Sequence, residues 1–128
     1  MAILEKRFLP GLRAAQAEIS ASFPDVRAET WSQTFGPGKG HVIGLACVFP
    51  NARIDQPDNV SLDICFGLRD PICTIDANVI WGHPGQLEAE VWPRPVPLTE
   101  EAIQRIESEL PRLLQVLREA VQRGMPIQ

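Results

Sequence analysis

The sequence has few of the side chains from which metal sites and hydrolytic active sites are built. It contains only two histidines, His41 and His83. If the strands predicted below form a meander, the two histidines lie at opposite ends of the sheet and cannot bind one metal ion together. We also expect no serine, cysteine or threonine to have a histidine beside it as a base. The sequence therefore predicts no catalytic residue, no metal site and no cofactor.

Cysteine is also scarce, and its placement argues against disulfides. Cys47, Cys65 and Cys73 are an odd number of residues, and none of them forms a CxxC motif. Reduced thiols in a cytoplasmic protein are the expected state for such a set.

Two kinds of partner are disfavoured by what the chain lacks. No apolar run is long enough to span a bilayer, and the charges of residues 5–7 interrupt both the apolar start and any signal peptide. A basic stripe that would bind nucleic acid is also missing. The net charge is −4, and residues 60–92 hold five acidic side chains against Arg69 alone. We therefore expect neither a membrane nor nucleic acid as partner, but a basic protein surface.

The length and composition predict a single α+β domain over residues 1–128. The chain is 45% hydrophobic and 22% charged, which is ordinary for a folded domain with its own core. Five segments are predicted to be strands, and their short connections favour an antiparallel meander: 27–35, 41–49, 60–67, 72–81 and 87–92. The glycine loop 36–40 lacks the spacing of a phosphate loop and is predicted to be a hairpin turn.

Two helices are expected to cover the apolar face of this sheet. The first is predicted to start with Pro10 in its first turn and to end near Ser22, with residues 1–9 left undecided. The second is long, capped by Thr99 and ended by Gly124, and Pro111 should kink or split it. The connector 93–97 is too rich in proline for a strand. The predicted fold is thus a five-stranded antiparallel meander between an N-terminal and a long C-terminal helix, both packed on one face.

Alternating apolar and polar residues also predict how the third, fourth and fifth strands pair. Joining 60–67 to 72–81 through the turn 68–71 places Asp63 opposite Asp76 and Ile64 opposite Ile75. A three-residue loop at 83–85 then places Trp81 opposite Leu87. The polar face of the three strands should carry Asp63, Asp76, Asn78, Glu88, Glu90 and Trp92.

Three interpretations of this acidic face are open. The first is a solvated surface, the second is a protein-binding surface, and the third is a site for a hard cation or for acid–base chemistry. A flat, wet sheet face does not exclude water, which disfavours the chemical alternatives. Trp92 is either an exposed anchor for a partner or a residue packed under the proline connector. Trp31 and Trp81 are expected to pack in the core or at an edge.

In size, charge and architecture the chain resembles bacterial immunity proteins and small effector chaperones. That resemblance implies a non-enzymatic adaptor or inhibitor that docks a basic partner on the acidic sheet face. A homodimer formed through that face or through the edge of the first strand is a second possibility. A different alternative is a small ligand-binding or catalytic domain with its cavity between the helices and the sheet.

Overall fold

The structure, a computed structural model, describes residues 2–35, 40–50, 58–67, 73–82 and 85–124. Its elements are α1 (Ala2–Ser22), β1 (Arg27–Thr34), β2 (His41–Val48), β3 (Asn59–Gly67), β4 (Thr74–Trp81), β5 (Leu87–Glu90), β6 (Val96–Pro97) and α2 (Glu100–Gly124). The strands form one antiparallel sheet in the order β1-β2-β3-β4-β5, with β6 beside β4. The predicted α+β meander with a helix at each end is confirmed.

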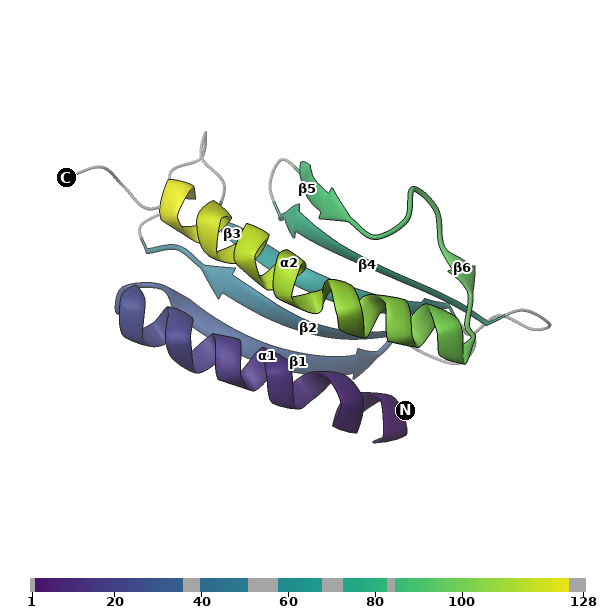
Figure 1. Cartoon of the computed structure of the whole chain (residues 1–128). Helices are drawn as coiled ribbons and strands as arrows, with labels where there is room; N and C mark the ends of the chain where they lie inside the picture. Colours follow the sequence, from purple (N-terminus) through teal and green to yellow (C-terminus); the bar gives the residue numbers. More distant parts are fainter. Residues whose placement is uncertain (1, 36–39, 51–57, 68–72, 83–84, 125–128) are drawn as a thin grey trace.

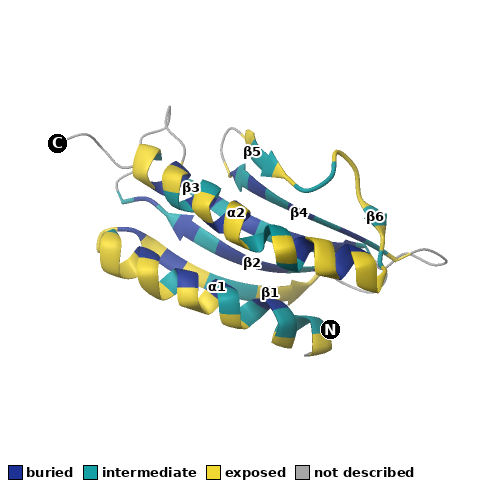
Figure 2. Ribbon diagram, viewed as in Figure 1, coloured by how far each residue is buried: buried dark blue, intermediate teal, exposed yellow. Residues whose placement is uncertain are grey.

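Both helices pack on the same face of the sheet and leave the other face without a helix (Figure 1). α1 lies against β1 and β2, whereas α2 lies against β3, β4 and β5. The apolar core fills the layer between helices and sheet, and Figure 2 shows the buried stripe of α2 turned toward the strands. We call the opposite, uncovered side the free face.

α1 is longer than the sequence indicated. It begins at Ala2, so Pro10 lies in the middle of the helix and the prediction of a first-turn proline is wrong. Pro10 is exposed, and its ring therefore costs one backbone hydrogen bond without disturbing the packed side. The packed side carries buried apolar residues at helical spacing: Phe8, Leu12, Ala15 and Ile19.

α2 is a single helix that starts where the sequence places it. The Oγ1 of Thr99 accepts a hydrogen bond from the N–H of Ala102 at 3.2 Å, as an N-cap residue does. Pro111 does not split the helix, which contradicts one of the two outcomes expected for it. Its side chain is exposed, so water can bond to the carbonyl group that its ring leaves unpaired.

The proline connector does contain a short strand, contrary to expectation. In β6, Val96 pairs with Ile75 and Pro97 with Thr74 at the start of β4. The N–H of Leu98 then donates to the carbonyl of Cys73. Proline is tolerated here because this two-residue strand lies at the edge of the sheet.

The predicted pairing of β3 with β4 is wrong by two residues. Asp63 lies opposite Asn78, and Ile64 lies opposite Ala77. Asp76 instead faces Cys65. A shift of two preserves the alternation of faces, so every side chain remains on its predicted side of the sheet. The connection between β3 and β4 is therefore longer than the turn we assumed, and most of it, 68–72, lies outside the described residues.

The predicted pairing of β4 with β5 is confirmed at one end only. Asn78 pairs with Glu90 and Val79 with Ala89, but the register shifts at the next residue. Ile80 pairs with Leu87, so Glu88 is the extra residue of a β-bulge and the predicted partnership of Trp81 with Leu87 is wrong.

Some predicted features cannot be placed. Gly36 to Lys39 of the glycine loop, His83 and Pro84 of the fourth turn, and the end of the chain lie outside the described residues. Among the helices that are described, none is long and apolar enough to cross a membrane.

Candidate protein-binding face

The free face is a mixed surface, with an aliphatic stripe on β2 and acidic groups on the strands beside it. Alternate residues of β2 place three aliphatic side chains there, namely Val42, Ala46 and Val48, on either side of Gly44. The carboxylates come from β3, β4 and β5. Apolar and polar side chains occur together in this way in protein interfaces.

Four of the six predicted site residues lie on this face. Asp63, Asn78 and Glu90 form a row across β3, β4 and β5 in the observed register. Asp76 lies on the same side, two residues before Asn78 in β4. The structure thus brings together the two aspartates, the asparagine and one glutamate, although in a different pairing from the predicted one.

Glu88 does not belong to this face, and that part of the prediction is wrong. Because Glu88 is the bulged residue of β5, its side chain turns toward the helix layer. Its carboxylate accepts a 2.6 Å hydrogen bond from Trp81 Nε1 and forms a 2.9 Å ion pair with Arg123 of α2. These bonds lower the pKa of Glu88, Arg123 contributing most.

Trp92 also lies on the helix side, so it does not face Asp76. Its half-buried ring packs against the core and lines a surface hollow together with Pro97, Ala102 and Arg105. β5 ends at Glu90, which releases the chain from the sheet before Trp92. The observed position matches the alternative in which the proline connector packs on this tryptophan.

Trp31 is an aromatic residue of the free face that the sequence did not place there. It lies on β1 opposite Gly44, and its ring meets the exposed ring of Phe35 edge to face at 6.3 Å. The signal was present in the sequence, because a strand glycine often marks a close approach by a neighbour. Without the pairing of β1 with β2, nothing linked Gly44 to Trp31.

Asp63 is in an unusual environment for a residue on an open face. Burial raises its pKa to about 6, opposed by the hydrogen bond that Ser61 donates and reinforced by the charge of Asp76. Its Oδ1 atom is buried and has no hydrogen-bond partner among the described residues. A buried acceptor without a hydrogen bond lowers the stability of the fold, so the Asp63 carboxylate would gain from a donor supplied by another molecule.

Asp76 shares these properties. Burial raises its pKa, a hydrogen bond from the Cys65 thiol lowers it, and the charge of Glu90 raises it. The Oδ1 of Asp76 is likewise buried and unpaired within the described part of the chain. In turn, burial is the largest cause that raises the pKa of Cys65 to about 12, so this thiol is protonated and is not a nucleophile.

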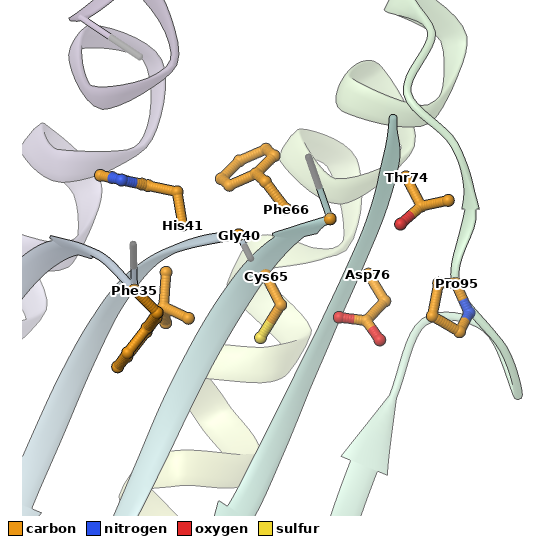
Figure 3. A pocket seen from close by; sticks show the side chains of 10 residues that line it. Phe35, Gly40, His41, Cys65, Phe66, Thr74, Asp76 and Pro95 are labelled. Carbon is orange, nitrogen blue, oxygen red and sulfur yellow. The ribbon is translucent and has the colours of Figure 1, made fainter. Parts of the chain in front are cut away.

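A shallow hollow of about 240 Å³ lies beside Asp76 at one end of the free face. Figure 3 shows the Cys65 sulfur and the Asp76 carboxylate on the same side of their strands, with Pro95 beyond Asp76 and Phe35 on the β1 side. The side chains of His41 and Phe66 point to the opposite side. The hollow therefore has mostly apolar walls and one carboxylate.

Contrary to expectation, the His41 ring lies beside the hydroxyl groups of a serine and a threonine. Its Nε2 is 2.7 Å from Ser32 Oγ and 3.7 Å from Glu5 Oε1, and its Nδ1 is 2.7 Å from Thr34 Oγ1. However, the Ser32 hydroxyl donates its hydrogen bond to Glu5, so the acceptor of that bond is the carboxylate and not the histidine. The cluster ties α1 to β1 and β2 on the helix side, and we assign it a structural role.

No protein-family model, curated protein or solved structure matches this chain. In the described ranges, no group of three or more histidine, cysteine, aspartate or glutamate side chains is arranged to hold a metal ion.

Proposed function

We propose that this chain is a non-enzymatic protein-binding module that docks a basic partner on its free face. The observation that carries the proposal is the contrast between paired and unpaired carboxylates. Arginines pair with the acidic residues of the helix layer: Glu18, Glu88, Glu100, Glu107 and Glu109. Across the described residues, no salt bridge reaches Asp63 or Asp76, although both carboxylates are partly withdrawn from water.

The composition of the face also supports a protein partner. A docked protein would bury the aliphatic stripe of β2 together with Trp31 and the exposed Phe35, while its basic groups met the carboxylates. Opposite charges on the two surfaces would increase the association rate and exclude acidic competitors. The same carboxylates disfavour a homodimer through this face, since two copies would oppose like charges.

Charge reversal on the free face is the direct test. The unmodified protein is compared with a free-face variant that carries Asp76→Lys and Glu90→Lys. Both proteins, and a control variant, serve as bait for partners from the source cells. The control carries Glu101→Lys and Glu119→Lys, two exposed α2 positions, and has the same net charge. Circular dichroism verifies that each variant folds.

We expect a basic partner to bind the unmodified protein and the α2 variant, and to be lost with the free-face variant. Calorimetry with that partner at low and moderate salt should show affinity falling as salt rises. Full-strength, salt-insensitive binding by the Asp76→Lys, Glu90→Lys variant would refute the proposal.

A further inference from the structure

The free face contains a small constellation built across three strands. The register aligns Trp31 of β1, Gly44 of β2 and Asp63 of β3 in one row. A Cβ atom on Gly44 would lie 2.8 Å from Trp31 Nε1 and 2.8 Å from Asp63 Oδ1. The indole nitrogen and the carboxylate oxygen are therefore separated by at most twice that distance. Because Gly44 has no side chain, the Trp31 and Asp63 side chains can both approach the backbone of β2 this closely.

The constellation presents hydrogen-bonding groups that nothing nearby satisfies. Trp31 Nε1, Asp63 Oδ1 and Asp76 Oδ1 are all buried, and none has a partner among the described residues. An indole N–H only donates, whereas an ionised carboxylate only accepts. A group that completes this site must therefore bring several N–H donors for two carboxylates and one acceptor for the indole.

We propose that this site takes an arginine side chain of the basic partner, with a main-chain carbonyl of the partner accepting from Trp31 Nε1. This inference rests on the proposed function and names the group that is recognised. Asp63 and Asp76 are diagonal neighbours on β3 and β4, because Asp63 pairs with Asn78. The planar guanidinium has five donors and can reach both carboxylates, which a lysine ammonium does less well.

The surroundings fit the rest of an arginine side chain. The hollow of about 240 Å³ is lined by Asp76 and by the apolar side chains of Val42 and Phe35, along which the aliphatic stem would lie. Figure 3 shows Asp76 and Phe35 at its two sides. The ring of Trp31, held edge to face by Phe35, is next to this path and offers an aromatic surface to the cation.

The test uses small probes, so that it does not depend on knowing the partner. The probes are N-acetyl-arginine N-methylamide, its lysine analogue and its citrulline analogue, which has the shape of arginine without the charge. The readout is the indole N–H signal of Trp31 in ¹H–¹⁵N NMR spectra at pH 7, assigned with Trp31→Phe. The indole signals of Trp81 and Trp92, which lie on the helix side, are internal controls.

We expect the arginine probe to shift the Trp31 signal saturably, and the lysine and citrulline probes to bind at least tenfold more weakly. Asp63→Asn and Asp76→Asn, each isosteric, should weaken the arginine probe about tenfold or more, with the remaining spectrum showing an intact fold.

A Trp31 signal that does not move, equal binding of the lysine probe, or full binding by both asparagine variants would overturn the arginine assignment. If the charge-reversed variant nevertheless loses the partner, basic docking stands without arginine recognition. If the arginine probe shifts the Trp31 signal but the partner binds the charge-reversed variant at full strength, the proposed function alone is refuted.

Discussion

Replacing Gly44 by alanine tests how the free face is built. The new Cβ would lie 2.8 Å from the backbone oxygen of Leu62, as well as 2.8 Å from Trp31 Nε1 and Asp63 Oδ1. The two side chains can rotate away, but the Leu62 carbonyl belongs to the ladder between β2 and β3 and cannot. Overpacking of this kind typically costs about 1–3 kcal/mol.

A smaller effect acts in the opposite direction. Alanine has less freedom in the unfolded chain than glycine, which stabilises the folded state by about 0.4–1 kcal/mol where the backbone accepts it. The net expectation is a loss of about 1–2 kcal/mol in the free energy of unfolding, which lowers the melting temperature by roughly 5 °C. Equilibrium urea unfolding followed by circular dichroism measures this loss.

Gly11→Ala provides the control with the same chemical change. Gly11 lies inside α1, and a Cβ atom added to it would lie 3.4 Å from the end of the flexible Leu110 side chain of α2. Alanine is favoured over glycine in a helix by about 1 kcal/mol, so this variant should be more stable than the unmodified protein. If Gly44→Ala is also stabilising, or leaves the indole signal of Trp31 unchanged, then the close approach at Gly44 is not as described.

Three further perturbations are informative. Because Asp63 keeps its proton to about pH 6 when folded but only to about 3.8 when unfolded, its pKa makes stability fall as pH rises between these values, by at most about 3 kcal/mol. Asp63→Asn should remove that fall in urea titrations from pH 4 to 7.5, and an unchanged slope would contradict the buried carboxylate. His41→Ala should cost about 2–4 kcal/mol in the same assay, since it leaves a cavity and unpaired hydroxyls; a loss below 1 kcal/mol would argue against the cluster around Ser32. Glu88→Gln should cost less than about 1 kcal/mol by losing the ion pair with Arg123, and it should leave partner binding unchanged, in contrast to Glu90→Lys.

The helices show which local signals were sufficient. Thr99 followed by acidic residues and an apolar stripe located the start of α2 correctly, because capping and the helix dipole act within one turn. Pro10 misled the prediction of where α1 begins, and Pro111 did not split α2, since a proline whose ring faces water costs less than one in a packed position. Exposure depends on what packs nearby, and that is not a local property.

The acidic site also combines features that follow from local sequence with features that depend on how the strands pair. Alternation along β3 and β4 was enough to place Asp63, Asp76 and Asn78 on the side away from the helices. The bulge in β5 could not be foreseen from alternation, and it moved Glu88 to the helix layer. Trp31 joined the site only through its pairing with Gly44.

By itself, the sequence determined the order of the elements, the meander, and the side of the sheet on which most strand side chains lie. These follow from short connections and from a hydrophobic pattern of period two, which burial against the helices enforces. The tertiary structure alone decided which residues face each other. A pattern of period two is unchanged by a shift of two residues, so it could not choose between Asp63 opposite Asp76 and Asp63 opposite Asn78. Only the assembled sheet, with β2 and β6 paired on either side of β3 and β4, selects one register and with it the site above Gly44.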